Sequence, residues 1–64
     1  MNAKQETALR ALVGRYNGLW NDSLFLPAGN LLGLPEGYVA GWVPDSNGKD
    51  RIFVGCSPEG EIHS

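Results

Sequence analysis

The stretch that decides the fold is 38–56, which reads YVAGWVPDSNGKDRIFVGC. Two runs within it, 38–43 and 51–56, are rich in β-branched and aromatic residues, and the polar segment between them contains the pair Asn47-Gly48. Such runs favour strands, and Asn-Gly accepts the positive φ angles that hairpin turns need. The pattern therefore predicts two antiparallel strands joined as a β-hairpin.

A third strand is expected directly after the hairpin. The segment 57–60 reads SPEG, with proline at the second and glycine at the fourth position of a turn. The residues that follow, 61–64, place Ile62 between polar neighbours, as in an alternating strand. We therefore expect a three-stranded antiparallel meander over residues 37–64.

On the N-terminal side, residues 2–17 predict one amphipathic helix. Its apolar residues recur at spacings of three and four and are Ala8, Leu9, Leu12, Val13 and Tyr16. Asn2 fits the N-cap with Gln5 three positions later, a weak capping box, and Gly18 fits the left-handed position just past the end. Gly14 weakens the helix interior by up to about 1 kcal/mol relative to alanine, unless it admits a strand or an aromatic ring.

The connection, residues 18–36, is too apolar for a solvated linker. Its large apolar residues include Trp20, Phe25, Leu31, Leu32 and Leu34. We interpret it as a structured loop that covers one end of the core. Within it, 23–26 is a candidate short strand that Pro27 would stop.

Together these elements predict a single α+β domain in which one helix packs on a small antiparallel sheet. The chain has 64 residues, 42% of them hydrophobic and 19% charged, which favours a folded state over disorder. Its single cysteine excludes an internal disulfide, and one cysteine with one histidine is too few to hold a structural zinc. We expect no metal and no cofactor.

The two faces of the predicted sheet are both apolar. Because side chains alternate along a strand, Tyr38, Ala40 and Trp42 share one side of the first strand and Val39, Gly41 and Val43 the other. In the second strand, Ile52, Val54 and Cys56 lie opposite Phe53 and Gly55. One helix can cover only one of these faces. Trp42, Phe53 and Tyr38 are therefore the candidate protein-binding residues; the alternative is that these rings form the core of a small monomer.

Two catalytic or metal-binding interpretations are weaker than the structural ones. Cys56 with His63 resembles a thiol nucleophile and its base, but Cys56 lies in strand-like sequence and His63 next to a terminus that is expected to fray. Asp45, Asn47 and Asp50 crowd one loop without the spacing of a calcium-binding loop. We expect no catalytic site.

Nucleic-acid binding by a helix-on-sheet architecture is the alternative function. The cationic residues are Lys4, Arg10, Arg15, Lys49 and Arg51, and the rings of Tyr38, Trp42 and Phe53 could stack bases. The chain has five basic and seven acidic residues, however, whereas a groove for phosphates needs clustered positive charge. Exposed rings beside neutral or acidic surface favour a protein partner.

The chain resembles small uncharacterised proteins encoded by actinobacteria and by their phages. The resemblance lies in 34–43, which reads LPEGYVAGWV, in 52–60, which reads IFVGCSPEG, and in the preceding segment 8–17. It implies a compact accessory protein, of the kind that is expressed in an infected cell to bind a host factor. It carries no known activity and identifies no functional residue.

These observations predict a small, non-enzymatic protein-binding or accessory protein that acts through an exposed apolar face or edge of the sheet. The partner is a host protein or a second copy of the chain, as a homodimer. The N-terminal residues are polar, and no apolar run approaches the roughly 18 residues that a membrane span needs. We expect a cytoplasmic protein without a membrane segment.

Overall fold

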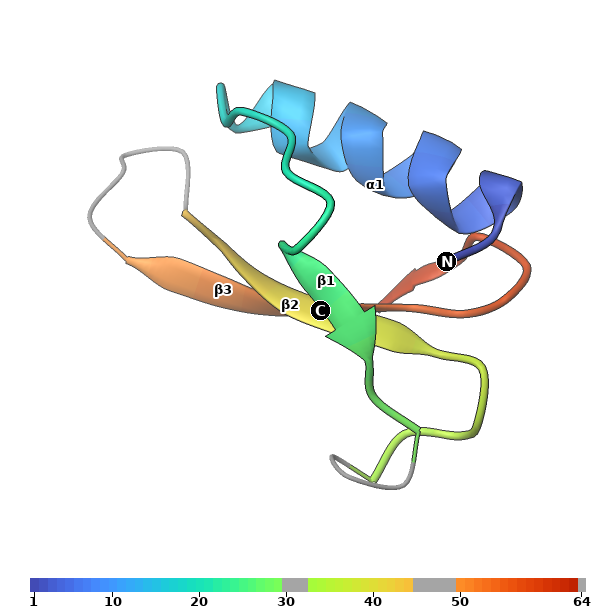
Figure 1. Cartoon of the computed structure of the whole chain (residues 1–64). Helices are drawn as coiled ribbons and strands as arrows, with labels where there is room; N and C mark the ends of the chain where they lie inside the picture. Colours follow the sequence, from blue (N-terminus) through green and yellow to red (C-terminus); the bar gives the residue numbers. More distant parts are fainter. Residues whose placement is uncertain (30–32, 45–49, 64) are drawn as a thin grey trace.

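The computed structural model describes residues 1–29, 33–44 and 50–63 and has an α+β fold (Figure 1). Its elements are α1 (Ala3–Arg15), β1 (Phe25–Pro27), β2 (Val39–Pro44), β3 (Arg51–Cys56) and β4 (Ile62–His63). The strands form one antiparallel sheet in the order β1-β2-β3-β4, and α1 lies across one of its faces (Figure 1). The predicted fold class is confirmed.

The sheet has four strands where the sequence predicted three. The additional strand is β1, in the segment that was expected to be extended, and it pairs with β2 so that Leu26 lies opposite Ala40. The backbone N–H of Ala28 donates to the carbonyl oxygen of Tyr38, so the nitrogen of Pro27 faces away from β2. Proline is tolerated there because this edge of the sheet needs no N–H from it.

The start of α1 is the capping box that the sequence predicted. The backbone N–H of Gln5 donates to the Asn2 side-chain oxygen over 2.8 Å, and the backbone N–H of Asn2 donates to Oε1 of Gln5 over 2.9 Å. The two bonds satisfy N–H groups that a helix start leaves without a partner.

The end of α1 differs from the prediction. Asn17, with φ of 58°, takes the left-handed position that was assigned to Gly18. Asn17 and Gly18 donate their backbone N–H groups to the carbonyls of Gly14 and Val13, which completes a Schellman motif. A Cβ at Gly18 would lie 2.9 Å from Cγ1 of Val13, so glycine is required there for space and not for its φ angle.

Gly14 does not make room for a strand or an aromatic ring, which was one explanation for a glycine inside the helix. No atom lies within 4 Å of the place of its Cβ.

The core lies between α1 and the sheet face that α1 covers. Its buried residues are Leu9, Leu12, Val13, Phe25, Val39, Val43, Val54 and Cys56. The helix stripe and the alternation of β2 and β3 are therefore as predicted. Trp20 stacks on Phe25 with 6.1 Å between the ring centroids, so these two residues of the connection pack in or against the core, as expected; Leu31 and Leu32 lie outside the described residues.

Side-chain hydrogen bonds hold the N-terminal end of α1 against the backbone that precedes β2 and the backbone that ends β3. Gln5 is only 2% exposed, and its Nε2 donates to the carbonyl oxygens of Gly37, over 2.9 Å, and of Cys56, over 3.3 Å. Nδ2 of Asn2 donates to the carbonyl oxygen of Pro58 over 2.8 Å. These bonds fix the helix on one face of the sheet and leave the opposite face to other segments.

Candidate protein-binding site on the outer sheet face

The outer face is the side of the sheet that points away from α1. Its residues alternate with those of the core and are Leu26 on β1, Ala40 and Trp42 on β2, Arg51, Phe53 and Gly55 on β3, and His63 on β4, with Tyr38 just before β2. The alternation predicted along each of the two hairpin strands is therefore confirmed, and the register of β2 with β3 places Phe53 on the same face as Trp42. The structure brings two of the three together.

Trp42 and Phe53 form the centre of the outer face. They lie opposite each other in the pairing of β2 with β3, and their rings meet edge to face with 5.0 Å between the centroids. Trp42 is 56% exposed, and Phe53 is half-buried beneath it. An aromatic pair in this geometry is stabilising, but most of the indole remains in contact with water.

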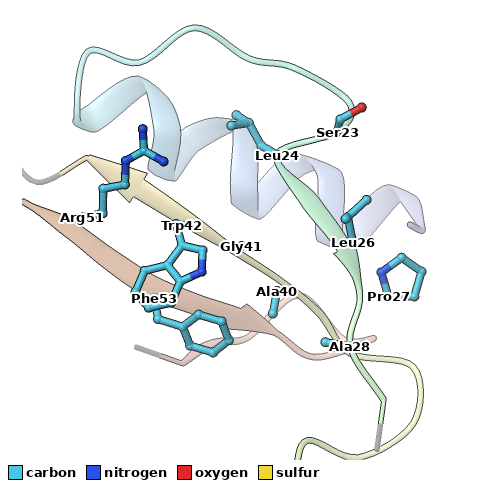
Figure 2. Close-up of a pocket in the computed structure, with 10 residues that line it drawn as sticks. All are labelled: Ser23, Leu24, Leu26, Pro27, Ala28, Ala40, Gly41, Trp42, Arg51 and Phe53. Atoms are coloured by element: carbon cyan, nitrogen blue, oxygen red, sulfur yellow. The ribbon is translucent and has the colours of Figure 1, made fainter. Parts of the chain in front are cut away.

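A groove runs between Trp42 and β1. It has a volume of about 460 Å³ and is open to solvent. Figure 2 shows Leu26 and Trp42 on either side of Ala40, whose small, buried side chain forms the floor. Leu26 is 59% exposed, so both walls present apolar surface. We call this feature the Trp42 groove.

The shape of the groove depends on Gly41. A Cβ on Gly41 would overlap the backbone oxygen of Leu24, so a larger residue would force β1 away from β2. With glycine, β1 lies close to β2, and the register places Leu26 beside Ala40. Leu26 is not among the site residues that the sequence pattern predicts. A segment of three strand residues gives too short a pattern to show which side chain faces outward.

Arg51 is the second lining residue that the sequence analysis did not place with the rings. It pairs with Pro44 in the register, next to the Trp42–Phe53 pair, and its exposed side chain lines the groove (Figure 2). From the sequence, Arg51 was predicted only as one of the cations of a nucleic-acid face. Arg51 lies two residues before Phe53 on β3, and residues two apart on a strand point to the same face; this spacing could have placed Arg51 beside Phe53.

Tyr38 lies at the other end of the outer face and does not line the groove. Its ring contacts that of His63 with 5.7 Å between the centroids. Leu34 lies over the same end, because its Cδ1 is 3.4 Å from the place of a Cβ on Gly55. The chain itself therefore covers part of the outer face near Tyr38, and the Trp42 end stays exposed.

Cys56 and His63 do not form a pair. Cys56 is fully buried on the helix side of the sheet, and His63 lies on the outer face. Burial raises the pKa of the Cys56 thiol, which disfavours the thiolate. Within the described residues, no three His, Cys, Asp or Glu side chains gather as metal ligands. Asp45 and Asn47, of the acidic loop, lie outside those residues.

The helix cations and the exposed rings occupy opposite layers of the molecule. Lys4, Arg10 and Arg15 lie on α1, which covers the other face of the sheet. Arg10 is placed 4.9 Å above the Trp20 ring and bonds to Glu6 over 3.3 Å. Of the basic residues that the structure describes, only Arg51 lies beside the Trp42–Phe53 pair; Lys49 is outside them.

Comparisons with known proteins found no matching family model, no similar curated protein and no similar solved structure. The resemblance to actinobacterial and phage proteins therefore stays a prediction. In the part of the chain that the structure describes, no helix has the length and apolar character needed to cross a membrane.

Proposed function

We propose that this chain is a small, non-enzymatic protein-binding module that contacts its partner through the Trp42 groove. The observation that carries the proposal is the exposure of Trp42 and Leu26 on either side of a floor made by Ala40. Tryptophan is among the residues most enriched at the energetic centres of protein interfaces. The partner is a host protein or a second copy of the chain, and an accessory role in the cytoplasm of a phage-infected cell is part of the same proposal.

The test compares wild type with Trp42→Gln and with Leu19→Gln as the matched control. Leu19 is 91% exposed but does not line the groove, so its replacement removes a comparable apolar side chain elsewhere. Sedimentation of the purified protein and affinity capture from the native host lysate are run on all three. We expect Trp42→Gln alone to lose the dimer or the captured partner. Identical behaviour of all three proteins would refute the proposal.

Nucleic-acid binding is the second candidate, favoured by the rings of Trp42, Phe53 and Tyr38 on one sheet face. Sheets that bind single-stranded RNA present rings in a similar way. The position of Arg10 and Arg15 on the opposite layer weakens this candidate. It predicts that a labelled oligothymidine binds at low ionic strength and dissociates steeply with added salt. Failure to bind at low salt would end it.

A further inference from the structure

The Trp42 groove is suited to a short peptide segment. Its volume of about 460 Å³ is in the range of sites that take one small ligand or a few residues, and its floor is formed by small buried side chains. The exposed walls, Leu26 and Trp42, stand on neighbouring strands above that floor (Figure 2). A single large apolar side chain that enters between them would cover surface that is now in water.

The charge carried by the described residues that line the groove is positive. Of the described residues that line it, Arg51 is the one that carries a charge. A guanidinium pairs with a carboxylate through two parallel hydrogen bonds, and beside this open groove such a pair gives a modest preference for an acidic segment. A lysine or arginine on the bound segment would instead meet a like charge.

A second copy of the chain is a poorer match for this surface. In a twofold dimer the same patch meets itself, so a favourable patch must be complementary to itself. The groove would bring Arg51 toward a surface whose described lining residues include no carboxylate. Charge complementarity therefore favours an acidic partner over self-association.

We propose that the Trp42 groove binds a linear peptide segment in which a large apolar side chain is followed by a carboxylate, with the apolar group between Leu26 and Trp42 and the carboxylate on Arg51. This inference rests on the protein-binding function proposed above. It adds the chemistry of the partner, which is an acidic and apolar segment.

The test uses capped peptides of the form Gly-Ser-Gly-Phe-X-Gly-Ser-Gly, in which X is Glu, Gln or Lys, and the same three with Leu in place of Phe. Each is titrated into ¹⁵N-labelled protein, and the indole N–H signal of Trp42 is followed by NMR. Trp20 is the internal reference, because this residue does not line the groove. Its indole Nε1 donates to Oδ1 of Asp22 over 3.0 Å. We expect the Trp42 signal to move and that of Trp20 to stay.

The variants test the role of Arg51. In wild type we expect the Glu peptide to bind about two- to fivefold more tightly than the Gln peptide, as an exposed ion pair allows, and the Lys peptide to bind most weakly. Arg51→Gln should remove the preference for Glu. Arg15→Gln deletes the same charge from the helix layer and should leave the preference unchanged.

The possible failures are distinguishable. Equal binding of the three peptides at the Trp42 signal would overturn the role of Arg51 and leave the protein-binding function standing. If no peptide moves that signal while sedimentation shows a dimer that Trp42→Gln abolishes, the occupant is a second copy and this inference is wrong. If no peptide moves the Trp42 signal and Trp42→Gln changes neither sedimentation nor the captured proteins, the proposed protein-binding function is wrong as well.

Discussion

Gln5 is the residue through which the helix and the sheet are joined. It serves the helix through Oε1, which accepts from Asn2, and the sheet through Nε2, which donates to the carbonyls of Gly37 and Cys56. Gln5→Leu keeps a similar size but removes all three bonds, including the donor to the buried carbonyl of Cys56. We expect a loss of about 2–4 kcal/mol in the free energy of unfolding, measured in urea. The control, Asn2→Ala, should lose only about 1 kcal/mol. Equal losses would show that water replaces the bonds of Gln5.

Gly14 and Gly18 lie four residues apart and should respond in opposite ways to alanine. At Gly14 a Cβ meets nothing, and alanine is the better helix former, so Gly14→Ala should stabilise the fold by about 0.5–1 kcal/mol. At Gly18 a Cβ would lie 2.9 Å from Cγ1 of Val13, and Gly18→Ala should destabilise it. Thermal and urea unfolding of both variants measure the two effects. A stabilised Gly18→Ala variant would contradict the close packing at this end of α1.

Cys56 gives the fold a defined dependence on alkaline pH. Burial raises the pKa of its thiol above the ordinary value of 9.0, so the unfolded chain ionises first as the pH rises. The neutral thiol therefore contributes fully to the free energy of unfolding below pH 9.0, and this contribution is lost as the pH rises toward the higher pKa of the folded state. We expect the free energy of unfolding to fall above about pH 9 in wild type and less steeply in Cys56→Ala. Parallel pH profiles of the two proteins would refute this assignment.

At the scale of elements, β1 depends on the absence of a side chain at Gly41. A Cβ there would overlap the backbone oxygen of Leu24, and Gly41→Ala should cost at least about 1–3 kcal/mol as β1 is displaced. Hydrogen exchange at the amide of Leu26 should accelerate, because that residue pairs with Ala40. The matched control on the next strand is Gly55→Ala. Its Cβ would make only an ordinary contact with Leu34, so unchanged exchange is expected there.

The elements that the sequence predicted are those whose signals are local. The capping box and the hairpin strands are each written in a few consecutive residues, and both are confirmed. The pairing of β1 could not be predicted in the same way. Its partner strand β2 is distant in the chain, and the close approach of the two strands depends on the absence of a side chain at Gly41. The partial exposure of either Trp42 or Phe53 was predicted from the sequence, because one helix covers only one face of the sheet. The groove was not, because it needs the placement of Leu26 and Arg51 in three dimensions.

At the scale of the molecule, the two faces of the sheet are covered to different extents. α1 buries one face completely at Val43 and Val54. On the outer face, Leu34 and the contact of Tyr38 with His63 cover one end only. A chain of this size has a total stability of only about 3–10 kcal/mol. Apolar surface that stays in water adds little to it, because the hydrophobic effect stabilises the fold through surface that is removed from water.

This difference predicts that the fold depends little on Trp42. Trp42 is 56% exposed, so Trp42→Ala removes the edge contact with Phe53, worth about 0.5–1.5 kcal/mol, and the burial of the smaller part of the Trp42 surface. Leu9→Ala removes a fully buried side chain and should cost about 2–5 kcal/mol, a large part of the total. Urea unfolding followed by circular dichroism compares the two variants. If Trp42→Ala is destabilised as much as Leu9→Ala, the ring is structural and its exposure is incidental. If it folds normally, the surface that Trp42 presents is free to serve a partner.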